Sequence, residues 1–150
     1  MAINWRTDYA IRLMCEIAKR GFGERDTVRR TAETVSVPYD YARTIARDLV
    51  SAGLLNSRRG VGGGIELARS AEQISILDVM RAMDDQASLS LCTADPSICG
   101  RSDTCPIHFG VWRGLDVMIE GYLSQHTLAD AVALGSQLEA SLAGRTRLAL

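Results

Sequence analysis

The chain has 150 residues, of which 47% are hydrophobic and 23% are charged, and its formal net charge is −1. This length and composition predict one compact domain, or a small domain with a dimerisation element, and argue against a disordered chain. No segment approaches the roughly 20 apolar residues of a membrane span, and the first residues lack the apolar core of a signal peptide. We therefore expect a cytoplasmic protein with no membrane partner.

Charge is distributed unevenly along the chain. Residues 1–69 carry a net charge of +4, and residues 70–150 carry a net charge of −5. The small overall charge argues against a protein that coats nucleic acid without selection. The positive charge of residues 1–69 is compatible with a nucleic-acid-binding face there, but the charge alone does not establish one, so sequence motifs are needed as evidence.

Residues 5–20 are predicted to form an amphipathic helix. Its apolar side chains recur at the four-residue steps of one helix face: Trp5, Tyr9, Leu13 and Ile17. Asp8 lies beside this stripe, where its plain interpretation is a first-turn carboxylate paired with Arg12. Cys15 fits as a small packed residue.

Two short helices joined by a tight turn are predicted next. The first begins after Thr27 and ends near Val35, and the second begins at Pro38 and ends near Ala52. The outward side of the second helix carries polar and aromatic residues: Tyr39, Asp40, Arg43, Thr44 and Arg47. This arrangement fits a helix-turn-helix, whose second helix enters the major groove of DNA. The alternative is a small helical domain whose charged faces are merely solvated.

A glycine-rich hairpin is predicted after these helices, with residues 54–57 and 65–67 as short strands. The residues between them that we expect to contact DNA are Arg58, Arg59, Gly60 and Gly62. Glycines let the backbone approach phosphates, and Arg59 can enter the minor groove. The segment lacks the motifs of nucleotide-binding phosphate loops. A hairpin without function is the remaining alternative.

A fourth helix is predicted from Ser75 to about residue 84, and a longer one from about 107 to 124. The apolar stripe of the longer helix is broad enough to pack on its own domain and on a partner subunit. Glycines at positions 110, 114 and 121 indicate close backbone packing, since glycine destabilises a helix interior. A short helix is predicted to begin near His126. The chain thus divides into residues 1–84, 85–106 and 107–150.

Three of the four cysteines, Cys92, Cys99 and Cys105, lie in a stretch with neither helical nor strand periodicity. In a reducing compartment, clustered cysteines are more often metal ligands or redox groups than disulfides. Their spacing suits an iron–sulfur cluster better than zinc. Three thiolates leave one iron in need of another ligand, for which His108 is the nearest candidate and Asp8 a remote one. The alternatives are unligated loop thiols and a cysteine-based redox or sulfur-transfer enzyme.

Taken together, these motifs resemble the Rrf2 family of bacterial winged-helix transcriptional regulators. The resemblance extends over nearly the whole chain and is carried by the three cysteines and by residues 7–10, 37–41, 59–64, 74–79 and 127–130. It implies a mainly α fold with a small β-hairpin wing, in which a winged helix-turn-helix domain precedes a long C-terminal dimerisation helix. It also implies a homodimer that binds a double-stranded DNA operator, usually as a repressor, and that is not an enzyme.

The resemblance further implies an iron–sulfur cluster bound through Cys92, Cys99 and Cys105. Asp8 matches the carboxylate that NsrR-like members donate from the other subunit, whereas His108 matches the fourth ligand of IscR-like members with a [2Fe-2S] cluster. We favour a [4Fe-4S] cluster with Asp8, which would sense nitric oxide, redox state or iron–sulfur status. The alternative regulator has no cluster and senses thiols or oxidants through the same cysteines.

Overall fold

The computed structural model of the protein describes residues 3–83, 88, 90–101 and 103–147, with side chains up to residue 142. Within this part of the chain, helices dominate and the only sheet is a two-stranded hairpin. The elements follow in the order α1 (Trp5–Arg20), α2 (Val28–Thr34), α3 (Tyr39–Ser51), β1 (Leu55–Arg58), β2 (Gly64–Leu67), a 3-10 turn (Ala71–Gln73), α4 (Ile76–Ala82), α5 (Leu91–Ala94), a 3-10 turn (Pro96–Ile98), a π-helical turn (His108–Trp112), α6 (Arg113–Gln125) and α7 (Leu128–Arg147).

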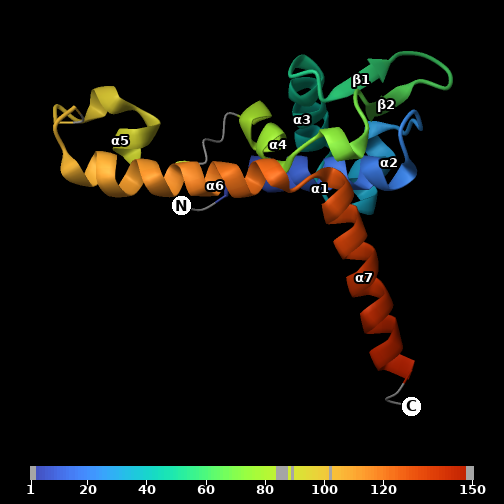
Figure 1. Ribbon diagram of the computed structural model, residues 1–150. Helices are drawn as coiled ribbons and strands as arrows, with labels where there is room; N and C mark the ends of the chain where they lie inside the picture. Colours follow the sequence, from blue (N-terminus) through green and yellow to red (C-terminus); the bar gives the residue numbers. More distant parts are fainter. Residues whose placement is uncertain (1–2, 84–87, 89, 102, 148–150) are drawn as a thin grey trace.

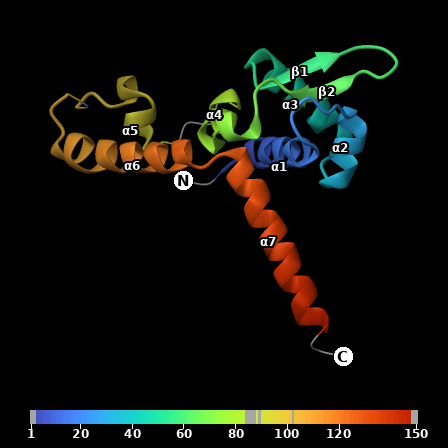
Figure 2. The ribbon, with the colours of Figure 1, turned by 45° about the vertical axis from the view of Figure 1, so that its right-hand side comes forward.

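The molecule consists of a winged domain and two helical extensions (Figure 1). Helices α1, α2 and α3 pack together beside the hairpin, and α4 lies next to them. Helix α6 extends away from this domain and carries α5 and the cysteine loop at its far end, while α7 leaves in another direction (Figure 2). The winged domain and the cysteine loop are therefore at separate places in one subunit.

Helix α1 forms where the sequence predicts it. The side chain of Asn4 caps its first turn by accepting from the Thr7 N–H at 2.9 Å, and Gly21 ends it with a φ of 100°. Its buried side chains line the core of the winged domain: Thr7, Ala10, Leu13, Met14 and Ile17. The predicted stripe is wrong at Trp5, which is 74% exposed because it lies at the helix end, outside this core.

The helix-turn-helix is confirmed. The Thr27 side chain accepts from the Arg30 N–H at the start of α2, and the Val37 N–H closes the turn by donating to the Ala32 carbonyl at 2.9 Å. Ser36 has a φ of 55°, a left-handed conformation that usually favours glycine. The inner side of α3 is buried in the core and leaves its opposite side exposed; the buried residues are Ala42, Ile45, Ala46 and Leu49.

The hairpin is confirmed as an antiparallel pair, in which Leu55 lies opposite Leu67 and Arg58 opposite Gly64. Its base is held against the segment between α1 and α2. There the Ile65 N–H donates to the Asp26 carbonyl at 2.8 Å, and the Asp26 N–H donates back to Ile65 at 3.1 Å. The wing therefore cannot move freely relative to the two helices.

The carboxylate of Asp26 strengthens this junction. It is buried and lies 2.7 Å from the Arg20 guanidinium at the end of α1. It also accepts from the Thr27 N–H at 2.7 Å, at the start of α2. Arg20 in turn contacts Glu16 at 3.2 Å. One ion-pair network thus joins both helices to the segment that holds the wing.

Helix α4 joins α6 to the winged domain. Ser75 and Asp78 cap α4 reciprocally, since each side chain accepts from the other residue's backbone N–H. A small apolar cluster then packs the two helices together: Leu77 and Met80 of α4 with Ile119 and Leu123 of α6. The predicted long helix of residues 107–124 is present, but its first turn, His108–Trp112, is π-helical.

The C-terminal helix differs from the prediction. The expected short helix near His126 is the 20-residue α7, which Thr127 and Asp130 cap through mutual hydrogen bonds. Alanine and leucine, which favour helix, let it continue. Its start is tied to α4, because the Ile76 N–H donates to the His126 carbonyl at 2.8 Å and Leu128 is fully buried.

The glycines of the π-helical turn and of α6 are not packed against the rest of the described chain. A Cβ built at Gly110, Gly114 or Gly121 would meet no atom within 4 Å. The close backbone packing inferred from these glycines is therefore not found within the described part of one subunit. The boundary predicted at residues 84 and 85 lies outside the described residues, so the division into three parts stays a prediction. No helix in the described ranges is long and apolar enough to span a membrane.

We expect Asp26→Asn to lower the free energy of unfolding by about 2 kcal/mol, because Arg20 loses a buried charged partner. Chemical denaturation measures this change. The control is Glu139→Gln, which removes the exposed pair between Lys19 and Glu139 and should cost about 0.5 kcal/mol or less. Equal losses in the two variants would contradict the role assigned to Asp26.

Candidate functional site

The exposed side of α3 presents the residues predicted to read DNA. Asp40, Arg43, Thr44 and Arg47 are exposed, and Tyr39 is half-buried at the helix start. The Arg47 side chain is 75% exposed. The Thr44 hydroxyl donates to the Asp40 carbonyl at 3.2 Å and is therefore partly occupied within the helix.

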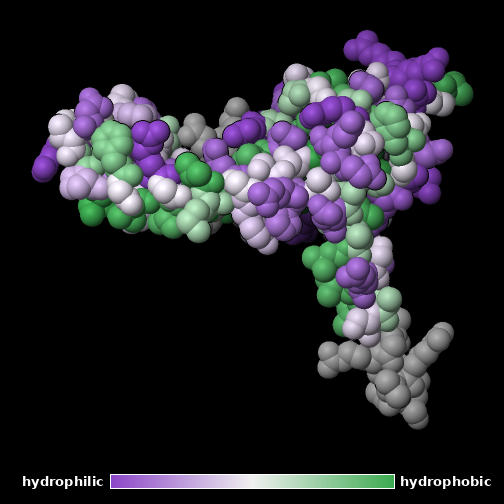
Figure 3. All heavy atoms as spheres, viewed as in Figure 1, coloured by the Kyte–Doolittle hydropathy of each residue, from purple (hydrophilic) through white to green (hydrophobic). Residues whose placement is uncertain are grey.

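The wing carries the other predicted contacts. Arg58, Arg59 and Gly60 are exposed, and Figure 3 shows hydrophilic side chains gathered over the wing. Gly60 and Gly62 have φ values of 97° and 71°, which favour glycine over residues with a Cβ. The glycine-rich sequence therefore determines the shape of the turn as well as its open surface.

Two cavities lie where α3 meets the wing. The first, which we call the wing notch, has a volume of about 430 Å³ and is lined by Thr27, Val28, Arg29, Tyr39, Arg58, Gly60, Gly63 and Gly64. The second has a volume of about 270 Å³, and Arg43, Arg47 and Ser57 contribute to its lining. The structure thus brings five predicted residues to the cavities beside the wing: Tyr39, Arg58 and Gly60 to the first, and Arg43 and Arg47 to the second.

Arg29 is a residue of this face that sequence reasoning missed. Its guanidinium carbon lies 4.2 Å from the centroid of the Tyr39 ring, which is a cation–π contact. The available signal was a basic residue in the first turn of α2, two positions after the capping Thr27. That signal is weak, because the second helix of the motif is the one that enters the major groove.

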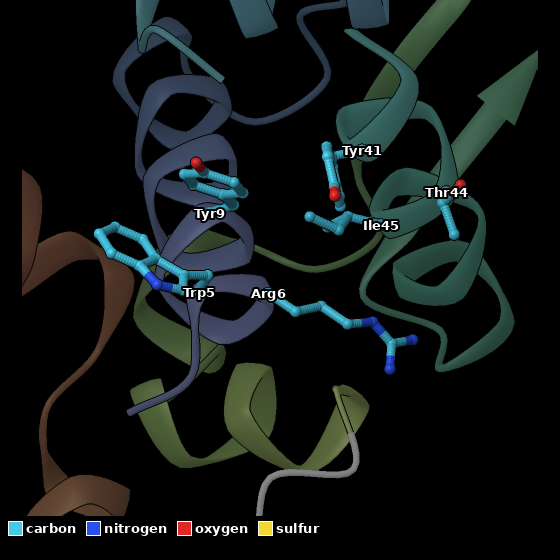
Figure 4. Close-up of a pocket in the computed structure, with 6 residues that line it drawn as sticks. All are labelled: Trp5, Arg6, Tyr9, Tyr41, Thr44 and Ile45. Atoms are coloured by element: carbon cyan, nitrogen blue, oxygen red, sulfur yellow. The ribbon is translucent and has the colours of Figure 1, made fainter. Parts of the chain in front are cut away.

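Thr44 instead borders an aromatic cleft between α1 and α3, with a volume of about 350 Å³. Figure 4 shows Trp5 and Tyr9 of α1 across from Tyr41 of α3, with Arg6 extended toward α3. The Tyr9 and Tyr41 rings meet edge to face, with centroids 6.3 Å apart. Arg6 is paired with Asp48 at 2.7 Å, so this cleft is mainly apolar.

The cysteine loop is built from short turns and not from irregular chain alone. Cys92 lies in the one-turn helix α5, and Cys99 follows the 3-10 turn Pro96–Ile98. Asp95 caps that turn by accepting from the Ser97 N–H and hydroxyl, at 3.0 and 2.6 Å. The hydrogen bond from the Ser97 hydroxyl, followed by that from its N–H, lowers the pKa of Asp95.

His108 is the only predicted fourth ligand that contacts a cysteine in the described chain. Its Nδ1 lies 3.5 Å from the Cys92 Sγ, and its side chain is buried against the loop. The Ser90 hydroxyl is 3.0 Å from the same sulfur. The Phe109 N–H donates to the Cys105 carbonyl at 3.2 Å, which attaches the end of the loop to the π-helical turn.

Asp8 lies on α1 and is paired with Arg12 at 2.7 Å, as its plain interpretation predicted. Both ribbon views place α1 apart from the cysteine loop (Figures 1 and 2). An Asp8 ligand would therefore have to come from a second subunit, which is how the resemblance assigns it.

The donor set fits an iron–sulfur cluster by type, because such clusters are bound by thiolates. Cys92, Cys99 and Cys105 are unpaired and half-buried on one loop. Among the described residues, no three His, Cys, Asp or Glu side chains are arranged to hold a metal ion. The loop would therefore have to close around a cluster.

The helix-turn-helix, the wing and their outward arginines define a winged-helix DNA-binding protein. The chain belongs to the Rrf2 family, since the model of that family, described as an iron-dependent transcriptional regulator, matches residues 3–134. It is therefore a DNA-binding transcriptional regulator. The expected fold class and family are confirmed.

Several relatives are similar over most of their length. NsrR of Bacillus subtilis is 30% identical over 136 residues, which cover 88% of this chain and 90% of the relative. NsrR of Shouchella clausii is 26% identical, covering 97% and 98% of the two chains, and IscR of Escherichia coli is 26% identical, covering 88% and 80%. All three are HTH-type transcriptional regulators and not enzymes, which excludes the enzyme alternative.

Solved structures share the fold. CymR of B. subtilis, the global cysteine regulator, matches with a TM-score of 0.74 and 22% identity, covering 89% of this chain and 98% of its own. The IscR of T. potens matches with a TM-score of 0.70 and 24% identity, covering 90% and 88%. The fold of this chain therefore occurs in other solved proteins.

We expect alkylation to distinguish Cys15 from the loop cysteines in protein without a cluster. Burial raises the pKa of the Cys15 thiol, an effect that Lys19 only partly opposes, and the thiolate is the reactive form. Pulse labelling with iodoacetamide and mass spectrometry should show Cys15 reacting about tenfold more slowly than Cys92, Cys99 or Cys105. In unfolded protein all four should react alike. Fast labelling of folded Cys15 would contradict its assignment as a packed residue.

Proposed function

We propose that this protein is a homodimeric repressor whose affinity for its operator is controlled by an iron–sulfur cluster that senses nitric oxide, redox state or iron–sulfur status. One observation carries the proposal: three half-buried thiols lie on one loop, beside a buried imidazole, at the far end of a helix that packs on the winged domain. Membership of an iron-dependent regulator family supports it.

DNA reading is assigned to α3 and the wing. Arg43 and Arg47 contact base edges or phosphates, while Tyr39 and Asp40 tune the choice of sequence. Thr44 adds a polar contact from the same side of α3. The wing follows the adjacent minor groove with Arg58, Arg59 and the exposed turn at Gly60 and Gly62.

Dimerisation is assigned to α6. Val117, Met118 and Tyr122 of this helix are 71%, 70% and 63% exposed, and Figure 3 shows apolar side chains along its lower edge. A second subunit would cover them and could approach closely at Gly114, where the chain itself leaves open space. Two recognition helices would then read half-sites about 34 Å apart, one duplex turn.

Cys92, Cys99 and Cys105 would hold the cluster, which supplies iron atoms that react with nitric oxide and oxidants. Asp95 caps and so stabilises the 3-10 turn between Cys92 and Cys99. The hydrogen bond from the Phe109 N–H holds Cys105 next to the π-helical turn that precedes α6. Closing of the loop around a cluster would bring the three thiolates together. In the absence of the cluster, the same loop is free to rearrange.

Helix α6 would transmit a change in the loop to the winged domain. The π-helical turn that precedes its outer end contacts the loop through His108, and its inner end packs on Leu77 and Met80 of α4. A rearranged loop changes the position of α6 in the dimer and hence the spacing of the two recognition helices. The population of dimers that fit the operator then falls.

The fourth ligand favoured from the sequence is Asp8 of the second subunit, with a [4Fe-4S] cluster. Identity with the NsrR relatives supports this choice. The contact between His108 and Cys92 favours the second candidate, His108 of the same subunit with a [2Fe-2S] cluster. The two candidates differ in cluster type and in whether ligation crosses the dimer.

The alternative function is a regulator that senses thiols or oxidants directly through its cysteines. Cys92, Cys99 and Cys105 are free and only partly buried, which favours it, because a sensing thiol must be accessible to its oxidant. So does the likeness in fold to CymR, named the global cysteine regulator of B. subtilis. Protein purified without oxygen that binds operator but contains no iron or sulfide would support this alternative.

We expect Arg59→Ala to weaken operator binding about tenfold at physiological salt, because the wing loses its minor-groove cation. Fluorescence anisotropy with an operator duplex measures this. Arg81→Ala on α4 is the control, since its side chain pairs with Glu120 away from the wing. Unchanged affinity for Arg59→Ala would count against the wing assignment.

We expect Cys99→Ala protein, purified without oxygen, to lose its iron, sulfide and visible absorbance and to bind DNA like the cluster-free protein. Asp8→Ala and His108→Ala identify the fourth ligand, because only the ligand variant should alter the absorption spectrum and iron content. The control is Cys15→Ala, which should keep full cluster content. Stoichiometric iron and sulfide in Cys99→Ala would exclude Cys99 as a ligand.

A further inference from the structure

The wing notch joins the three parts that a winged helix places against DNA. Arg29 comes from the first turn of α2, Tyr39 from the first residue of α3, and Arg58 from the end of β1. All three line one cavity of about 430 Å³ that opens beside the wing. A ligand in this cavity would therefore touch both helices of the motif and the wing together.

The positive charge of the notch is not compensated by a carboxylate in the part of the chain that the structure describes. Within the described residues, no carboxylate lies at ion-pair distance from Arg29 or Arg58, whereas the neighbouring Arg30 lies 3.8 Å from Asp26. Arg29 instead lies over the Tyr39 ring, a contact that leaves its N–H groups available to an acceptor. Arg29 and Arg58, neither of them paired with a described carboxylate, thus line one open cavity.

The glycine side of the notch is formed by tightly packed backbone. The Gly63 N–H donates to the Gly60 carbonyl at 2.9 Å and closes the wing turn. A Cβ built at Gly63 would overlap the Arg58 carbonyl oxygen, and one at Gly64 would overlap that of Asp26. These two positions therefore need glycine, and they add no side chain to the cavity.

These properties match a phosphate group. Guanidinium groups donate in a planar fork that suits phosphate oxygens, and bare backbone lets a bulky anion approach. The exposed side of α3 and the wing flank the notch, so a duplex lying against both would pass its backbone across the opening. A phosphodiester of the bound DNA is therefore the expected ligand.

We propose that the wing notch binds one backbone phosphate of the operator, held by Arg29 and Arg58 together, and that Arg29 also orients the Tyr39 ring. The proposal rests on the proposed use of α3 and the wing as the DNA-reading face, and it adds a contact from α2. A phosphate held between α2 and β1 fixes the wing relative to the recognition helix, which sets the register of both on the duplex.

The test is the salt dependence of operator binding by Arg29→Gln. Each phosphate contact contributes about 0.9 to the slope of log affinity against log salt, so the slope should fall in magnitude by about one. Affinity at physiological salt should fall about five- to tenfold, for operator and unrelated duplex alike. Arg29→Lys, which keeps the charge, should retain most of the slope. An unchanged slope for Arg29→Gln would overturn the proposal.

A double-mutant cycle tests whether the two arginines share one phosphate. Arg58→Gln alone should lower the slope by about one, and the double variant should lose little more than either single variant. A slope lowered by about two in the double variant would mean two separate phosphates and would overturn the shared site. The melting temperatures of all variants should match the wild type, since Arg29 and Arg58 are exposed.

Two further variants separate this inference from the function on which it rests. Arg81→Gln, on α4, should leave the slope unchanged; an equal loss there would overturn the proposal by showing a general charge effect. If Arg59→Ala weakens binding and Arg29→Gln does not, the notch proposal fails and the DNA-reading face stands. If neither change weakens binding, the proposed DNA-reading face itself fails.

Discussion

The position of the wing depends on one buried residue, Asp26, between α1 and α2. Its peptide group exchanges two hydrogen bonds with Ile65 of β2, and its carboxylate contacts Arg20 and the Thr27 N–H. A buried carboxylate is tolerated only while such partners stay in place, because the unpaired charge would be costly. The end of α1, the start of α2 and the hairpin therefore keep one arrangement. The proposed DNA-reading face depends on it, since Arg29 follows Thr27 by two residues in the same turn.

The second constraint is the small contact between α6, which carries the cysteine loop, and α4 of the winged domain. Helix α6 has no fully buried side chain among its described residues, and it meets α4 mainly through Ile119 and Leu123. So small a contact area stabilises one position of α6 only weakly. A weakly held helix can take more than one position when its other end changes, which is what the proposed sensing requires. By contrast, the junction between α6 and α7 is fixed to the winged domain, because Leu128 is buried and the Ile76 N–H donates to the His126 carbonyl.

Local features were predictable from the sequence, and contacts between distant segments were not. Helix α1, the helix-turn-helix and the hairpin follow from periodicity and capping, which depend on neighbouring residues. The exposure of Trp5 and the length of α7 were missed, since the first depends on where the core ends and the second on the absence of a strong breaker. The contacts of Arg29 with Tyr39 and of Cys92 with His108 join separate elements. The spacing of residues along the chain does not predict such contacts. The chemistry of Tyr39, Cys92 and His108 did mark each of them as a candidate functional residue.

The choice of fourth ligand also decides whether cluster binding and dimerisation are linked. An Asp8 ligand would come from the second subunit, because α1 lies apart from the loop in its own chain (Figure 1). Each cluster would then bind only the dimer, so dimerisation would strengthen cluster binding and the cluster would strengthen the dimer by the same factor. With His108, which already contacts Cys92, a single subunit supplies every ligand and this linkage vanishes. In a sensor of the first kind, loss of the cluster weakens the dimer by that factor. In one of the second kind, the dimer affinity does not depend on a shared ligand, and only the spacing of the recognition helices changes.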